Sequence, residues 1–270
     1  MSRVDLLGYG MNVDVVPGVL PLDTIFLHGN LASNTWWEPA LAEWKSQASA
    51  KPGLEGRFIA AEWRGCGKSE APQAEAELHP AHLAEDYIQL CSALNIKKAC
   101  LVGHSTGGII ALYAMLKAPQ LFDRAVLLDP VGATGIQFGP EMYAAFTQMS
   151  NDRAVCEMVM NGTIHGGDTK SALFQRIVDD AFGIAKMNWH GVAKALHVTD
   201  ISKDLSKIQQ PILVLHGEVD PVIPIESSRV LTSGLPNARL EVLNGHGHST
   251  NVEDPKLFVS KVNEFLFHRL

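Results

Sequence analysis

Short apolar runs alternate along the chain with segments in which apolar residues recur at helical spacing. Continuous apolar runs are typical of strands buried on both faces of a parallel sheet, and the helical segments between them would cover those faces. This pattern predicts strands at Val13–Val16, Thr24–Leu27, Phe58–Ala61, Lys98–Val102, Ala125–Asp129, Ile212–Gly217 and Leu240–Leu243. It predicts helices at Trp36–Trp44, Pro80–Leu94, Thr106–Leu116, Ser227–Ser233 and Pro255–Phe267. The expected fold class is α/β, a mostly parallel central sheet with helices on both faces.

One long stretch interrupts the alternation. Between residues 132 and 205 there is no strand pattern, only helical segments at Pro140–Met149, Asp152–Met160, Lys170–Phe182 and Trp189–His197. Most connections between elements are only a few residues long, so this stretch is too long to be a loop. We therefore expect residues 132–205 to form a helical cap (lid), inserted into a core made of residues 1–131 and 206–270. Methionines are frequent in the stretch and suit either an adaptable apolar pocket or contacts between small helices.

Composition narrows the class of protein. The 270 residues are 46% apolar and 19% charged, enough for one large core. The formal net charge of −7 offers no basic surface for nucleic acid or an anionic membrane, so neither is expected as a partner. The first residues do not resemble a signal peptide, and a cytoplasmic protein is expected. The oligomeric state is not indicated. The cysteines show no metal-binding or redox spacing and are expected to be buried free thiols: Cys66, Cys91, Cys100 and Cys156.

The strongest chemical signal is a pentapeptide, Gly103-His104-Ser105-Thr106-Gly107. It follows a predicted strand and leads directly into a predicted helix. A G-x-S-x-G turn in this context holds the serine on strained backbone at the strand tip, beside the free N–H groups of the helix N-terminus. Ser105 is therefore the candidate nucleophile.

A serine hydroxyl needs a base, and the base needs a carboxylate that orients it. Asp220 follows the predicted strand Ile212–Gly217, and His248 follows the last predicted strand, as Ser105 follows an earlier one. Open α/β sheets place active sites at the carboxyl ends of their strands. Alternatives exist for both residues. Asp129 also ends a predicted strand, and Glu218 is close to Asp220 but too near the strand end. His246 lies in the same turn as His248.

An oxyanion formed during acyl transfer requires hydrogen-bond donors. The loop His28-Gly29-Asn30 after an early strand offers the backbone N–H of Asn30, or of Leu31, and the first helical residue after the serine offers that of Thr106. His28 is expected to hold this loop by a hydrogen bond. No metal site is expected, because His246 and His248 belong to no helical H-E-x-x-H pattern or spaced cysteine and histidine set.

Taken together, these segments resemble the α/β-hydrolase superfamily, in its cap-bearing, esterase-like branch with a serine nucleophile. The resemblance covers nearly the whole chain, through His28-Gly29-Asn30, Arg64-Gly65-Cys66-Gly67-Lys68-Ser69, Gly103–Gly107, Gly217–Asp220 and Gly247-His248 with Glu253 and Pro255. It implies the triad Ser105, Asp220 and His248. It favours His248 over His246, because the family's base stands directly before a small residue.

The resemblance implies a serine hydrolase without a cofactor that cleaves a small to medium apolar carboxylic ester, or a lactone or thioester, through an acyl-enzyme. Two enzyme alternatives are a carbon–carbon bond hydrolase of ring-cleavage products and a cofactor-free haloperoxidase. A non-catalytic ligand receptor on the same fold is the alternative from another class, since fold does not determine function. The residues expected to line the substrate pocket are Leu31, His104, Met142, Met158 and Trp189.

Overall fold

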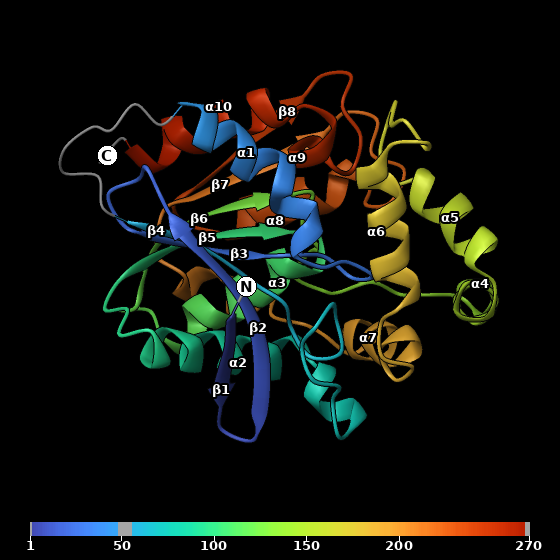
Figure 1. Ribbon diagram of the computed structural model, residues 1–270. Coiled ribbons are helices and arrows are strands. Elements are labelled where there is room, and N and C mark those ends of the chain that lie inside the picture. The colour runs from blue at the N-terminus through green and yellow to red at the C-terminus, as the bar shows by residue number, and fades with distance from the viewer. Residues whose placement is uncertain (1, 48–55, 268–270) are drawn as a thin grey trace.

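The computed structural model describes residues 2–47 and 56–267. An eight-stranded sheet runs through the molecule in the order β1-β2-β4-β3-β5-β6-β7-β8 (Figure 1). Strands β3 to β8 are parallel to one another, and β1 and β2 are antiparallel to their neighbours. The strands are β1 (Ser2–Leu6), β2 (Tyr9–Pro17), β3 (Asp23–Leu27), β4 (Arg57–Ala61), β5 (Ala99–His104), β6 (Phe122–Leu128), β7 (Ile212–Gly217) and β8 (Ala238–Leu243). The predicted mostly parallel α/β class is confirmed.

Helices cover both faces of the sheet. Every residue of β5 and of β7 is buried, which explains why these strands have continuous apolar sequences. Aromatic residues such as Phe26, Trp44 and Phe258 pack between the sheet and the helices of one face, and a larger apolar cluster fills the other. The first face carries α1 (Glu38–Gln47) and α10 (Pro255–Phe267), and the second carries α2 (Pro80–Ala93), α3 (Thr106–Lys117) and α8 (Ile225–Gly234).

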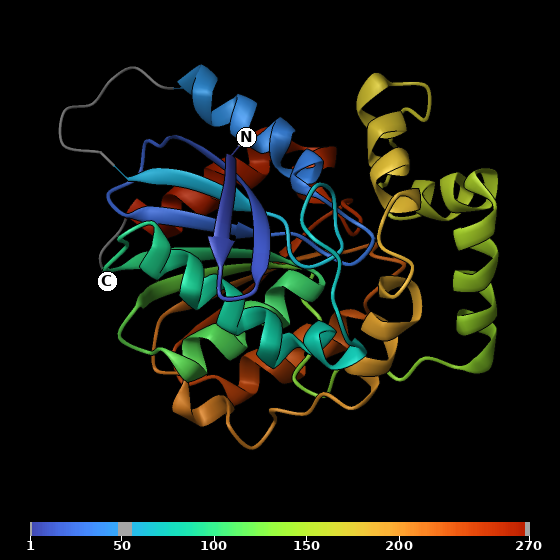
Figure 2. The same ribbon diagram turned by 60° about the horizontal axis from the view of Figure 1, so that its bottom comes forward.

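Between β6 and β7 the chain forms α4 (Pro140–Asn151), α5 (Arg153–Asn161), α6 (Ala172–Phe182) and α7 (Asn188–His197). Figures 1 and 2 show these helices gathered at one side of the sheet. Their sequences are amphipathic: in α6 the buried residues Phe174, Ile177, Val178 and Ala181 recur at helical spacing, so that one stripe faces the interior. The helices occur where the sequence predicts them, and their role as a separate cap remains a prediction.

Two further observations concern the chain as a whole. All four cysteines are buried and unpaired, as expected. Among residues 2–47 and 56–267, none of the helices combines the length and the hydropathy that crossing a bilayer requires.

Candidate active site

Ser105 lies in a tight turn between β5 and α3. Its backbone has φ 54° and ψ −118°, a conformation that a non-glycine residue rarely adopts. The two glycines of the pentapeptide permit the turn. A Cβ at Gly103 would lie 2.6 Å from the carbonyl oxygen of Gly107, and a Cβ at Gly107 would overlap the carbonyl oxygen of Leu27. Strained backbone of this kind is maintained only where the surrounding structure holds it, and it is typical of functional sites.

Asp220 and His248 form a hydrogen-bonded pair beside this turn. The imidazole Nδ1 of His248 donates to Oδ2 of Asp220 over 2.8 Å, and Oδ1 of Asp220 accepts the backbone N–H groups of Val222 and Ile223 at 2.7 and 3.1 Å. Burial would raise the pKa of Asp220, but the hydrogen bond and charge of His248 and the two N–H groups outweigh burial and hold that pKa below its ordinary value. Asp220 is therefore ionised and oriented toward His248.

Ser105 and His248 line the same cavity, which has a volume of 380 Å³. In the described part of the chain no hydrogen bond joins the Ser105 hydroxyl to the His248 imidazole. Such bonds are often long before substrate binds and shorten in the complex. His246 lies elsewhere: its Nδ1 bonds the carbonyl of Asn244, and its side chain does not line this cavity.

His104 holds the backbone of His248. Its Nε2 donates to the His248 carbonyl over 2.8 Å, and the two rings are 4.8 Å apart between centroids. Burial, with the nearby His248, lowers the pKa of His104 to about 3, so its imidazole is neutral at ordinary pH. The residue before the candidate nucleophile therefore fixes the main chain of the candidate base.

The neutral state of His104 predicts a pH-dependent stability difference. Below its ordinary pKa of 6.5 the unfolded chain binds a proton on His104 that the folded protein does not. The free energy of unfolding should therefore decrease as the pH is lowered from 6.5 to about 3. A His104→Gln variant retains an N–H donor but loses this proton. Urea unfolding at about pH 5.5 and 4.5 should show a smaller loss of stability in the variant, by roughly 1.4 kcal/mol per pH unit. Equal losses would mean that His104 titrates normally in the folded protein.

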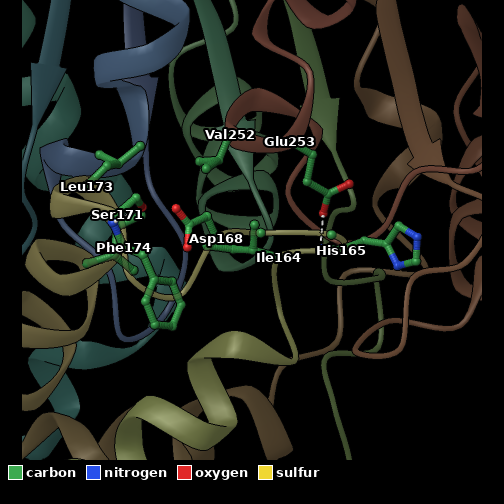
Figure 3. A pocket seen from close by; sticks show the side chains of 11 residues that line it. Ile164, His165, Asp168, Ser171, Leu173, Phe174, Val252 and Glu253 are labelled. Carbon is green, nitrogen blue, oxygen red and sulfur yellow. Dashed lines mark hydrogen bonds between the residues drawn. The ribbon is translucent and has the colours of Figure 1, made fainter.

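Glu253 ties the His248 turn to the inserted helices. It lies in the short helix α9 (Thr250–Glu253), and its carboxylate accepts the backbone N–H groups of Gly247, Ser249 and His165 at 2.7, 3.0 and 2.9 Å. Figure 3 shows Glu253 reaching the backbone of His165 beside a second cavity, of 220 Å³. In the sequence Glu253 is recognisable only as part of a motif, whereas in the structure it anchors the loop.

The expected oxyanion donors lie at the first cavity. Asn30 and Thr106 both line it, and within the described chain neither backbone N–H is engaged in a hydrogen bond. Leu31, the alternative to Asn30, has a positive φ of 54° and also lines the cavity. His28 bonds the carbonyl of Gly29 through Nδ1, as the sequence analysis expects, and stacks on Trp63.

Three of the five expected pocket residues line the cavity: Leu31, His104 and Met142. Met158 and Trp189 do not. Met158 is 68% exposed, because the adjacent positions of α5, Val159 and Met160, turn toward the cavity and direct it to solvent. Trp189 is buried in the large core cluster. Among the lining residues that the sequence pattern does not indicate are Trp36, Ile136, Phe138, Phe146, Val159, Met160, Thr163, Leu196, Val222 and Ile223.

The cavity is lined mainly by apolar side chains. Aliphatic, aromatic and thioether side chains from the inserted helices face the end of the sheet that carries Ser105. No lysine, arginine, aspartate or glutamate lines it in the described part of the chain. A charged group inside such a cavity would lose its hydration without gaining a partner, so the cavity favours an uncharged ligand.

Asp129, the alternative carboxylate, follows β6 and is fully buried. It does not line the cavity, and its Oδ1 accepts the backbone N–H of Gly217 over 2.8 Å. In the described chain the carboxylate bonded to His248 is Asp220.

This geometry agrees with a family relationship. The profile of the alpha/beta hydrolase fold family matches residues 25–255, and the chain belongs to that family. It is 28% identical to a 2-hydroxymuconate semialdehyde hydrolase of Pseudomonas putida over 84% of this chain and 86% of that protein. It is 27% identical to the carboxylesterase YbfK of Bacillus subtilis over 90% and 79%. An esterase of Exiguobacterium antarcticum, 21% identical, superimposes with a TM-score of 0.85 over 98% of both chains and shares the fold. The family and these relatives support an enzyme that acts as a hydrolase.

Proposed function

We propose that the protein is a serine hydrolase that cleaves small to medium, uncharged apolar carboxylic esters through an acyl-enzyme. The observation that carries the proposal is the arrangement at the 380 Å³ cavity: a serine on strained backbone and a histidine paired with a buried carboxylate at 2.8 Å open onto the same apolar space. A nucleophile, a base and an orienting acid are the groups that acyl transfer needs.

Each residue of the site has its own role in the proposed reaction. The Ser105 hydroxyl oxygen attacks the acyl carbon while its proton passes to Nε2 of His248, and Asp220 stabilises the imidazolium. The carbonyl oxygen becomes an oxyanion that accepts hydrogen bonds from the backbone N–H groups of Asn30 and Thr106. The bond to the alcohol then breaks as His248 returns the proton to the leaving oxygen. A water molecule repeats the sequence on the acyl-enzyme, releasing the acid and restoring Ser105.

The cavity supports the proposed substrate class. Apolar side chains of α4 and α5, among them Met142, Phe146 and Met160, supply a surface for an aliphatic or aromatic group. We propose that residues 132–205 act as a cap that sets the size of this group. The lack of a charged lining residue in the described chain argues against ring-cleavage products, which carry a carboxylate, and favours neutral esters, lactones and thioesters.

A matched pair of substrates tests this function. The protein should hydrolyse p-nitrophenyl butyrate with a kcat/KM about tenfold or more above that for p-nitrophenyl hemisuccinate, whose acyl chain has the same length but ends in a carboxylate. A series from acetate to octanoate, with a lactone and a thioester, would locate the preferred size. Preference for the hemisuccinate would contradict the proposed substrate class.

The same panel separates the alternatives. Turnover of a vinylogous diketone without turnover of any ester would favour a carbon–carbon bond hydrolase. Tight binding of an apolar ligand, with no turnover of any substrate, would favour a receptor on the hydrolase fold.

A further inference from the structure

A second carboxyl group lies behind the Asp220–His248 pair. Asp129, at the end of β6, is 0% exposed, and its two oxygens differ. Oδ1 accepts the N–H of Gly217, whereas Oδ2 is buried and has no hydrogen-bond donor among the described residues. An ionised carboxylate in this position would keep one oxygen without a donor, at a large cost in solvation.

The neighbours of Asp129 do not compensate a negative charge. The titratable groups beside Asp129 are Asp220 and His216, and one side-chain atom from each of the three residues lies within 4.8 Å of the others. Asp220 is itself the anion of the Asp220–His248 pair, with three N–H donors on its oxygens. Two carboxylates so close together cannot both ionise without a cation between them.

His216 does not supply that cation. Its Nε2 lies 3.1 Å from the carbonyl oxygen of Ile223, which can only accept, so Nε2 carries the proton. Its Nδ1 lies 2.8 Å from the Ser228 hydroxyl and accepts from it. Burial lowers the pKa of His216, which keeps the ring neutral. Because both nitrogens are engaged, the cluster of Asp129, His216 and Asp220 also does not favour a metal ion.

We propose that Asp129 is a positioning residue that stays protonated at Oδ2 and donates this O–H to the carboxylate of Asp220. The proposal rests on the function proposed above, since the hydrogen bond acts on the carboxylate that orients His248. The proton satisfies the unpartnered oxygen, and the carboxylate of Asp220 gains a fourth donor. The extra donor spreads the negative charge of Asp220 and holds its plane toward the imidazole.

The electrostatic surroundings of Asp129 favour this protonation state. Burial raises the pKa of Asp129 well above its ordinary value, and the negative charge of Asp220 raises it further, with a smaller contribution from Glu253. The N–H of Gly217 acts in the opposite sense. The backbone of Asp129 has a positive φ of 44°, a conformation that asparagine and glycine also adopt.

The protonation state can be measured without catalysis. In protein labelled with ¹³C at the aspartate carboxyl carbons, the Asp129 signal should stay at the position of a protonated acid between about pH 5 and pH 8. An Asp129→Asn variant assigns the signal by its loss. A signal at the ionised position across this range would overturn the proposal, whether or not the protein hydrolyses esters.

The pH profile of kcat/KM tests the positioning role. Asn at position 129 keeps an acceptor for Gly217 and a donor for Asp220, so Asp129→Asn should leave the acid limb of the profile in place. Asp129→Gly tolerates the positive φ but removes the donor. Asp220 then becomes more basic and holds the proton on His248 more tightly, so the acid limb should move up by roughly half a pH unit or more.

The direction in which the acid limb moves distinguishes the protonated from the ionised form of Asp129. If Asp129 were ionised, both variants would remove a negative charge near His248 and would move the acid limb to lower pH. If Asp129 were merely structural, neither variant would move it, and the proposal would fail. The groups that face these residues, His104 and His216 at His248 and Glu253 at Asp129, are unchanged in both variants. If ester turnover is absent but the protonated signal is present, the proposed function fails and the carboxyl pair stands.

Discussion

Replacing Ser105 by alanine should lower kcat for p-nitrophenyl butyrate by about 10⁶-fold, the scale observed when a triad nucleophile is removed. The reason is that the covalent route is lost: no other hydroxyl among the lining residues stands on strained backbone beside a helix N-terminus and the His248 ring. Alanine removes one oxygen from a buried turn and leaves the backbone able to fold, so KM should change little. Initial rates at high enzyme concentration, with circular dichroism to verify folding, would measure the effect.

Ser202→Ala is a suitable control, because this exposed serine does not line the cavity. It should retain the wild-type rate. A fluorophosphonate probe should label the wild-type protein and Ser202→Ala once per chain and should not label Ser105→Ala. Retained turnover in Ser105→Ala would mean that another group, or an activated water, performs the attack, and the acyl-enzyme mechanism would then be wrong.

The architecture is predictable from this sequence where burial and periodicity agree. The predicted strand Ile212–Gly217 and helix Pro255–Phe267 have the observed bounds of β7 and α10. One is buried at every position, and the other begins at a proline and buries one stripe, so each pattern permits a single interpretation. The sequence pattern does not indicate β1, because Ser2–Leu6 is mostly exposed and pairs only with β2, at the edge of the sheet.

Boundaries depend on pairing that a sequence does not display. The sequence pattern predicts an end of this strand at Val102, yet β5 continues to His104, because Gly103 and His104 pair with Leu127 and Leu128 of β6. The strand therefore runs directly into the serine turn. This continuation explains how the turn is held rigidly enough to keep Ser105 strained.

The candidate site, too, is predictable from the sequence only in part. Ser105, Asp220 and His248 follow three strands that end at one edge of a parallel sheet, so the sequence could predict that they lie at the same edge. The cavity wall could not. Whether Met158 or Met160 faces the cavity depends on how α5 rotates against its neighbours, and the methionine content of the segment does not contain this information. The closeness of Asp129 to Asp220 follows from β6 and β7 being neighbours in the sheet, which the sequence left open.

Replacing Asp220 by asparagine should lower kcat by about 10⁴-fold while leaving the fold intact. The structure explains why so small a change has this effect. Oδ1 of residue 220 accepts the backbone N–H groups of Val222 and Ile223, so the amide oxygen of asparagine must take that position and the NH₂ group must face His248. Nδ1 of His248 then accepts a hydrogen bond, and the ring proton moves to Nε2. A protonated Nε2 cannot take the proton of Ser105, so the enzyme holds the wrong tautomer.

Glu218→Gln is the matched control, because it makes the same change of charge in the same turn. Its carboxylate bonds only the N–H of Gly245 in the described chain, and glutamine can still accept that bond, so kcat should stay within about twofold of wild type. ¹⁵N NMR of the imidazole would detect the tautomer directly, with the proton on Nδ1 in the wild type and on Nε2 in Asp220→Asn. Nearly normal activity in Asp220→Asn would transfer the orienting role to Asp129. Since Asp129 is the protonated member of the proposed pair, that result would contradict the assignment of both carboxyl groups at once.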